Sequence, residues 1–465
     1  MNAMKSILLS ALVCGGISSA FADVVTPEST GFKFTDTKVV PTTSIKNQSE
    51  TGTCWCFSVV AFLENEIIRT SGKSVDLSEM FVVRNLYPEK AQKFMRMEGE
   101  IRFNQGGGVK DVLYAWDKYG MVPESVYSGL NYGEEIHDHL ELIAGLKGYL
   151  KGIVAKPSKR YSTAWLRGVN GILDAYLGEV PEKFEVDGVE YTPKTYAASF
   201  GLNMVDYKAF TSFTHHPFYQ EFIIEIPDNW LWTPLMNVPL DEMEQIVDNA
   251  IMNGYSVAWA ADMSEKSWQW DNGYAILPQL KTEANMTAKE KERWKRLPDA
   301  DRESVLYEFF GPQPEIEVTQ EVRQQMFDSF ETVDDHLMVI VGLAKDQKGN
   351  KYYKVKNSLA QTKFTMATST FQAHISVPRP SILWCIKMAF QQVFNQKLSN
   401  NGNVRHRRNI LRRNRPAESH GGSAIVQQRG KGCGRCGGTG DDQVWTLPEA
   451  VCQQCVVPKP RFLPR

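Results

Sequence analysis

A polar loop that runs directly into an apolar helical segment, residues 48–69, constrains this chain more than any other part of its sequence. The loop holds Gly52 and then Cys54, and residues 59–69 carry apolar side chains on one helical face. Cys54 is therefore expected in the first helical turn, where unpaired backbone N–H groups and the helix dipole favour an anion. Such a position lowers the pKa of a thiol and favours the nucleophilic thiolate. Gln48 is a neutral donor that can fold back across the loop to stabilise an oxyanion.

A base for such a thiol is available far downstream in the chain. His336 stands at the start of an apolar run, residues 337–343, which predicts a strand. Residues 351–356 alternate as a second strand, which ends at Asn357. Taken alone, Cys54 has an ordinary interpretation as a buried cysteine, and His336 as a half-buried strand histidine. A cysteine, a histidine and an asparagine together favour a catalytic interpretation.

Residues 47–58, with the sequence NQSETGTCWCFS, resemble the catalytic segment of papain-superfamily cysteine peptidases. The later order of histidine and then asparagine is also the order of that superfamily. The resemblance implies that Cys54 is the nucleophile, that His336 takes and returns the proton, and that Asn357 holds the imidazole in the useful tautomer. It also implies that Gln48 and the backbone N–H of Cys54 receive the oxyanion. Peptides are the implied substrates, and no cofactor is required.

Residues 191–196, 237–244 and 254–262 resemble the aminopeptidase C and bleomycin hydrolase branch of the superfamily. This resemblance implies an α+β, papain-like fold, in which a helical domain carrying the cysteine packs on a β-sheet or barrel domain carrying the histidine and the asparagine. It also implies aminopeptidase activity. In the family a glycine pair binds the substrate backbone, and this role is carried over to Gly107 and Gly108. An ordinary loop before a helix is an equal alternative for these glycines.

Four regions are expected along the chain. Residues 1–22 have a positive start, a short apolar run and a small-residue cleavage site, which predicts a signal peptide and export to the periplasm or beyond. Residues 23–360 form the expected peptidase domain. Within it, the helical part spans about 54–130, a large insertion about 131–330, and the histidine and asparagine strands about 331–360. Residues 361–465 are a basic tail of different character.

Composition limits the other classes of partner. A net charge of −2 gives no reason to expect nucleic acid, and no later apolar run is long enough to span a bilayer. Between Asp23 and Ala360 the cysteines are Cys54 and Cys56, and one intervening residue makes a disulfide between them strained. Cys54 is therefore expected to be free and Cys56 to pack. A homo-oligomer is left open.

Two histidine pairs, His215 with His216 and His137 with His139, raise the question of a metal site. No carboxylate or cysteine stands at a convincing ligand spacing in the sequence, so these residues are expected to be surface histidines and no metal is expected.

The tail has two competing interpretations. The family follows the asparagine and serine with tryptophan and glycine, whereas this chain has Leu359 and Ala360. A shifted reading frame from about this point would explain the change, and the present residues are then expected to contribute no regular strand. The alternative is a zinc ribbon with a basic nucleic-acid arm at 405–415. Its ligands would be two C-x-x-C pairs, Cys433, Cys436, Cys452 and Cys455.

The favoured function is therefore cysteine-type peptide hydrolysis, with an aminopeptidase preference. Two alternatives stay open at this point. One is a papain-like binding protein that has lost catalysis, and the other is zinc-dependent nucleic-acid binding through the tail.

Overall fold

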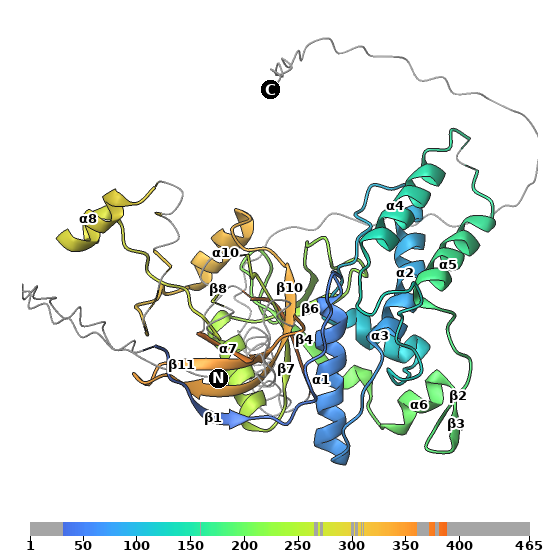
Figure 1. Ribbon diagram of the computed structural model, residues 1–465, viewed down its shortest axis with the longest axis horizontal. Coiled ribbons are helices and arrows are strands. Elements are labelled where there is room, and N and C mark those ends of the chain that lie inside the picture. The colour runs from blue at the N-terminus through green and yellow to red at the C-terminus, as the bar shows by residue number, and fades with distance from the viewer. Residues whose placement is uncertain are drawn as a thin grey trace, which may run out of the picture. The chain divides into compact units, whose positions relative to one another are not determined.

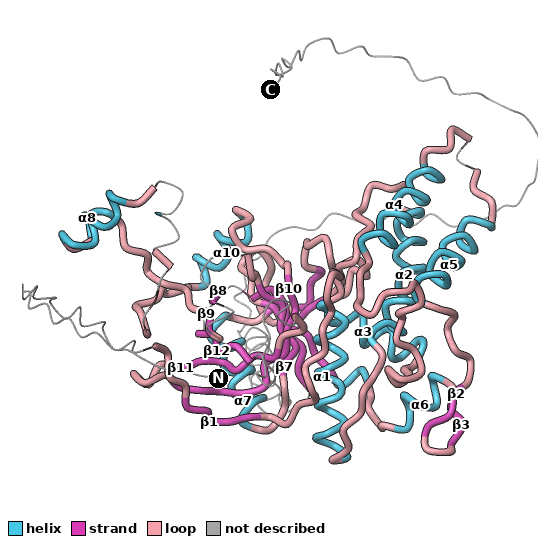
Figure 2. Tube along the Cα trace, in the orientation of Figure 1, coloured by secondary structure: helices cyan, strands magenta, loops and turns pink. Residues whose placement is uncertain are grey.

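The computed structural model describes residues 31–158, 160–264, 268–269, 273–298, 302, 306–307, 309 and 311–359, and the backbone alone of residues 372–376 and 381–387. Helices and strands combine in an α+β arrangement, as predicted, drawn as a ribbon in Figure 1 and by secondary structure in Figure 2. The expected signal peptide and the four tail cysteines lie outside the described residues. Within the described part, no helix has both the length and the apolar character needed to cross a bilayer.

Helix α1 (Cys54–Ser71) begins at the predicted nucleophile and is buried along most of its length. Every residue from Cys54 to Ile67 is buried, so the apolar face seen in the sequence is only part of the contact surface. The helix ends at Gly72, whose φ of 71° is the left-handed conformation that glycine adopts without steric cost. In Figure 1, α1 lies between the helices that follow it in the chain and the strands of a large β-sheet.

The helices that follow α1 share one apolar core with it. Ser78 caps α2 by accepting a hydrogen bond from the N–H of Phe81 at 3.0 Å. Arg84 on α2 reaches Asp174 on α5 at 2.5 Å, which links two helices far apart in sequence. These helices are α2 (Glu79–Arg96), α3 (Val109–Tyr119), α4 (Leu140–Val154), α5 (Ala164–Leu177) and α6 (Pro193–Ser199).

One lysine ties the loop before α1 to the first two helices. The Nζ of Lys46 lies 3.0 Å from Glu64 on α1, 2.9 Å from Glu79 on α2 and 2.6 Å from Asp76 between them. It also donates to the carbonyl of Leu77 at 2.7 Å. Glu64 and Glu79 are almost fully buried, so this ammonium group contacts carboxyl groups that water does not reach.

The other part of the fold is a large mixed sheet. Its strand order is β5-β6-β4-β13-β7-β10-β11-β12-β9-β8, and β1 also pairs with β10. Its strands are β1 (Thr35–Val39), β4 (Tyr207–Thr211), β5 (Glu221–Ile223), β6 (Pro234–Asn237), β7 (Val257–Ala261), β8 (Trp268–Gln269), β9 (Tyr274–Ala275), β10 (His336–Lys345), β11 (Lys351–Lys356), β12 (Gln372–Ser376) and β13 (Ser381–Lys387). A separate hairpin joins β2 (Phe184–Val186) to β3 (Val189–Tyr191).

Strand β10 is central because three neighbours share it. Residues 336–340 pair with β7, residues 342–345 pair with β1, and β11 runs along the opposite edge. Helix α1 packs against β10, and so does α7 (Leu240–Met252). Nine of the ten residues of β10 are buried, which explains why its sequence is a continuous apolar run rather than an alternating one. Two further helices, α8 (Ala288–Arg296) and α10 (Gln320–Asp328), belong to later connections.

The expected insertion, about residues 131–330, contributes to both parts of the fold: α4 and α5 join the helical core, while β4 and β7 join the sheet. The expectation that the tail adds no strand was wrong. Strand β12 pairs with β11, and β13 pairs with β7 and β4, so the edge of β11 is covered.

Candidate functional site

The predicted histidine and asparagine meet at one end of the sheet. His336 is the first residue of β10, and Asn357 directly follows the last residue of β11. The two strands are antiparallel, with Val339 opposite Lys356, so their ends lie together. The Nε2 of His336 lies 2.6 Å from the Oδ1 of Asn357. Both side chains are buried, which holds this bond away from water.

The orientation of the Asn357 amide is fixed by its neighbour. The backbone N–H of Ser358 donates to Asn357 Oδ1 at 2.8 Å, which identifies this atom as the oxygen. Because the oxygen accepts, Nε2 of His336 carries its proton, and the lone pair of a neutral imidazole is at Nδ1. The ring is therefore held in the tautomer that can accept a proton at Nδ1.

Cys54 reaches the same place from the helical half. The hydroxyl of Ser58, on α1, donates to the carbonyl of Leu337 at 2.6 Å, which anchors the helix one residue after His336. The backbone N–H groups of Leu337 and Trp55 face the Cys54 sulfur and stabilise its ionised form. Cys54 and His336 line one cleft of about 410 Å³ between the helical part and the sheet.

Gln48 is held rigidly at the edge of this cleft. Its Nε2 donates to the carbonyl of Thr51 at 2.7 Å, and its Oε1 accepts from the hydroxyl of Ser358 at 2.6 Å. The backbone of Gln48 also donates to the carbonyl of Ser358 at 2.8 Å. An amide nitrogen has two N–H groups, so one of them is not used by Thr51 and can face a ligand. Sequence reasoning did not assign a role to Ser358.

A loop that contains three glycines, residues 104–108, contacts the segment around Cys54. The Nε1 of Trp55 donates to the Gln105 carbonyl at 2.9 Å, and the Gln105 side chain accepts from the N–H of Gly52 at 2.8 Å. Gly106 and Gly107 line the cleft. A Cβ on Gly106 would collide with the Asp228 carboxylate, and one on Gly107 would lie 2.9 Å from the Trp55 ring.

Of the predicted glycine pair, Gly107 lines the cleft and Gly108 directly follows it. Gly107 lies where the sequence placed it, but Gly108 is the N-cap of α3 and is not among the cleft residues. The N–H of Gly108 donates to Asp111 at 3.0 Å within that helix start. Gly106 lines the cleft as well, and its close approach to Asp228, more than 100 residues away, could not be seen in the sequence.

Burial sets the protonation of the cysteine and the histidine. It raises the pKa of the Cys54 thiol to about 12, with Asp334 and Asp228 adding to the effect, while the backbone N–H of Leu337 opposes it. Burial also lowers the pKa of His336 to about 4, although the bond to Asn357 opposes this change. This direction is opposite to the lowered thiol pKa that the helix start predicts, because desolvation outweighs the effect of the backbone N–H groups. With these pKa values, the Cys54 thiol and the His336 imidazole are each uncharged at neutral pH.

Three carboxylates give the cleft an acidic wall, which the sequence analysis missed. Asp228, Asp334 and Asp335 all line it. Asp335 accepts from the backbone N–H of Met263 at 2.9 Å, whereas Oδ1 of Asp334 is buried without a hydrogen-bond partner among the described residues. Burial raises the pKa of Asp334 to about 8 and that of Asp335 to about 6.

The remaining sequence candidates have other surroundings. Cys56 is fully buried and its thiol donates to the Glu79 carbonyl at 3.2 Å, so it packs as expected, and both Cys54 and Cys56 are free. His139 is not a surface histidine: it is fully buried, and burial lowers its pKa to about 4. His215 and His216 are partly exposed, but Glu225 lies between their rings. Both are therefore surface histidines, as predicted, and the sequence spacing gave no sign of the Glu225 carboxylate because it comes from a different part of the sheet.

Comparison with known proteins gives a family match and a similar fold. Residues 28–132 match the family model of papain family cysteine proteases. The fold is similar to the crystal structure of PepW from Lactobacillus rhamnosis HN001 (DR20), with a TM-score of 0.55 and 18% sequence identity over 78% of this chain and 85% of that chain. A structure from a study of the mite allergens Blo t 1 and Der p 1 gives 12% identity over 74% of this chain and 67% of that chain, but its TM-score of 0.32 is too low to support an argument.

Proposed function

We propose that this chain belongs to the papain superfamily and hydrolyses peptide bonds with the Cys54 thiol as nucleophile, a proposal that the family match and the similar fold support. The observation that carries the proposal is the hydrogen bond between His336 and Asn357 at the cleft that also contains Cys54. In this proposal His336 Nδ1 takes the thiol proton as sulfur attacks the carbonyl carbon, and later returns it to the leaving amine. The chemistry requires no cofactor.

The oxyanion of the tetrahedral intermediate would be received by Gln48 and by the backbone N–H of Cys54. Gln48 suits this task because its amide is fixed before substrate arrives, with Thr51 on the nitrogen and Ser358 on the oxygen. A donor that is already oriented costs no reorganisation during the reaction. Gly106 and Gly107 line the same cleft as the sulfur, so their backbone groups would lie beside the substrate backbone.

The direct experiment measures hydrolysis of an aminoacyl fluorogenic substrate by the purified chain, before and after treatment with a thiol alkylator. Thiol-dependent turnover is expected. Absence of turnover with every aminoacyl and peptidyl substrate would instead favour a papain-like binding protein without catalysis.

We further propose that the enzyme prefers substrates with a free amino terminus, as the branch resemblance implies. The support from the site is the acidic wall, because Asp334 has a buried oxygen without a partner in the described part and Asp228 lies on the same cleft. A substrate ammonium group would supply the missing partner. Burial raises the pKa of Asp334 to about 8, and a substrate ammonium beside it would favour the ionised carboxylate in the complex.

Replacing Asp334 with asparagine is therefore expected to reduce the preference for a free amino terminus over an acetylated one by about tenfold or more, because a buried charge pair is lost. The measurement is kcat/KM for the same aminoacyl or dipeptidyl substrate with and without the acetyl group. The acetylated substrate is the internal control and should change little. An equal loss for both substrates would show that Asp334 supports the fold and does not recognise the amine.

Ser358 is expected to act through Gln48. The Ser358→Ala variant should reduce kcat by about tenfold while changing KM little, because the amide loses the contact that orients it and oxyanion stabilisation weakens. A double-mutant cycle with Gln48→Ala is the measurement. Once Gln48 is gone, removal of the Ser358 hydroxyl should add little. Fully additive effects would mean that Ser358 does not work through the amide.

The pH dependence follows from the two pKa values. The neutral pair of Cys54 and His336 holds one transferable proton between about pH 4, where His336 becomes protonated, and about pH 12, where the thiol ionises. Transfer of this proton from the Cys54 sulfur to the His336 nitrogen does not change the total number of protons on the pair. kcat/KM for an acetylated substrate should therefore rise through about pH 4 and stay high through neutral pH. A rise only near the ordinary thiol pKa of about 8.5 would contradict it.

A further inference from the structure

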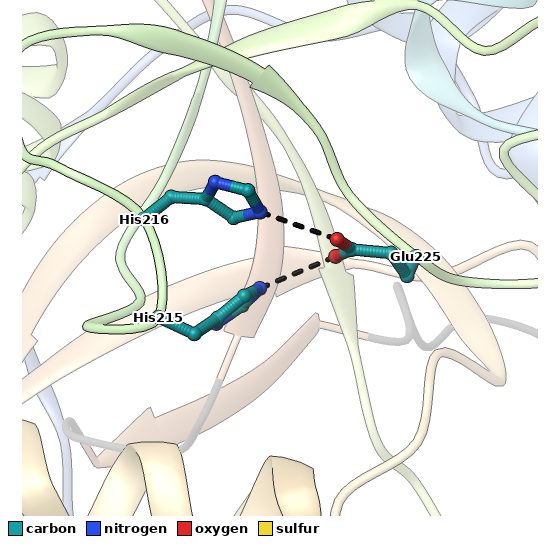
Figure 3. A group of neighbouring side chains, drawn as sticks. All are labelled: His215, His216 and Glu225. Carbon is teal, nitrogen blue, oxygen red and sulfur yellow. Dashed lines mark hydrogen bonds and ion pairs between the residues drawn. The ribbon is translucent and has the colours of Figure 1, made fainter.

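Two histidines and a glutamate converge on the surface of the sheet half. His215 and His216 follow β4, and Glu225 follows β5, two strands that are separated in the sheet by β6. Figure 3 shows both rings directing a nitrogen to the Glu225 carboxylate. His215 Nε2 lies 3.2 Å from Oε2, and His216 Nε2 lies 3.2 Å from Oε1. One ligand atom from each residue lies within 4.8 Å of the others.

The separations suit a metal ion as well as they suit hydrogen bonds. Ligands at 2.0–2.2 Å in a tetrahedral zinc site are roughly 3.3–3.5 Å from one another. The two nitrogen-to-oxygen distances are close to that spacing, so small side-chain movements would admit an ion between the three groups. Two histidines and one carboxylate also form a known zinc ligand set, which leaves the fourth position to water.

The two rings are held in place by surrounding side chains. The His215 ring is stacked on Phe327 with an interplanar angle of 13°, and the His216 ring is stacked on Phe222 at 22°. The turn that carries them is fixed by Asn237 on β6, whose amide donates to the carbonyl of His216 at 2.9 Å. Ligands that are oriented before binding lose less entropy when an ion arrives.

The outer nitrogen of His215 also has a partner. Gln324 on α10 approaches His215 Nδ1, with its Oε1 at 3.3 Å and its Nε2 at 3.1 Å. The backbone N–H of Thr214 donates to the same Oε1 at 2.6 Å, which fixes the amide oxygen on this side. If an ion took the Nε2 lone pair, the ring proton would lie on Nδ1 and donate to Oε1 of Gln324, as in many histidine ligands.

Glu225 is suited to be the shared ligand, because each of its two carboxylate oxygens already faces one imidazole nitrogen, Oε2 toward His215 and Oε1 toward His216. The side chains are exposed by 29% for His215, 35% for His216 and 60% for Glu225, which gives an ion a route of entry from solvent.

We propose that His215, His216 and Glu225 form a binding site for a divalent transition-metal ion, best matched by zinc, that clamps the turn after β4 to the segment after β5. Water would complete the coordination. The ion would replace the two direct hydrogen bonds, and imidazole with carboxylate favours zinc over magnesium or calcium. The site uses no residue of the proposed peptidase machinery.

The test measures zinc binding by calorimetry on the full chain carrying Cys54→Ala, compared with the same chain carrying His216→Ala and Glu225→Gln as well. Loss of one zinc equivalent, or a fall in its affinity of about 100-fold, is expected in the second protein. Thiolates elsewhere in the chain are present in both proteins and cancel in the comparison. Equal stoichiometry and affinity in the two proteins would overturn the proposal.

Cobalt provides a second readout that does not depend on stability. Co²⁺ at a histidine and carboxylate site gives visible d–d absorption without a sulfur charge-transfer band. This spectrum should appear in the first protein and be absent from the second. Melting temperatures in the presence of a chelator should be similar, because the exposed hydrogen bonds contribute little. A sulfur charge-transfer spectrum that is the same in both proteins would place the metal at cysteines and refute the assignment.

Discussion

The Cys54→Ala variant is expected to lose hydrolysis by about four orders of magnitude or more while keeping its fold, because the change removes the sulfur that forms the covalent intermediate. Cys54 is the first residue of α1 and lines the cleft, so its thiol is not a central packing element of the helical core. The measurements are kcat/KM with an aminoacyl substrate, and thermal unfolding to show that the protein remains folded.

The matched control is Cys56→Ala, two residues further along the same helix. Cys56 is fully buried and its thiol donates to the Glu79 carbonyl, so its loss should reduce stability by about 1 kcal/mol and leave most of the activity. Comparison of these two variants separates the loss of the nucleophile from the loss of a packed thiol, at two positions within one helical turn. An inactive Cys56→Ala variant beside an active Cys54→Ala variant would reverse the assignment.

The Lys46→Met variant is expected to lose about 3–5 kcal/mol of folding stability, which is the usual cost of leaving buried charges without their partner. The methionine side chain would keep the apolar stem but lack the ammonium that contacts Glu64, Glu79 and the Leu77 carbonyl. Since a domain of ordinary stability has about 5–15 kcal/mol in total, the variant would be severely weakened. Chemical denaturation of both proteins is the measurement.

The sign of the pH dependence follows from Glu79. Burial raises its pKa to about 8 in the folded state, so protonation favours folding, and this contribution is lost as pH rises through about 8. Without Lys46 the carboxylate becomes costlier to ionise, so the stability deficit of the variant should be larger at about pH 8 than at about pH 5.

Lys183→Met serves as the control for a charge lost at the surface. Lys183 pairs with Glu190 at 2.8 Å, but both side chains are about two-thirds exposed, at 64% and 67%. Solvent screens such a pair, so the loss should be within about 1 kcal/mol. Equal losses for the Lys46 and Lys183 variants would show that the buried network contributes little.

Sequence alone located the elements that carry the proposed chemistry. The loop and apolar run predicted a helix with Cys54 in its first turn, and α1 begins at that residue. An apolar run and an alternating run predicted the strands that start at His336 and end before Asn357. These features depend on local periodicity and turn chemistry, which neighbouring residues determine.

Only the tertiary structure decided how distant residues meet. Ser358 fixes the Gln48 amide across 310 positions in sequence, and Glu225 reaches both histidines by crossing from another strand. The raised thiol pKa likewise depends on burial by both halves of the molecule, which a helix start does not reveal. Such contacts follow from strand order, and desolvation follows from packing, so neither leaves a periodic signal along the chain.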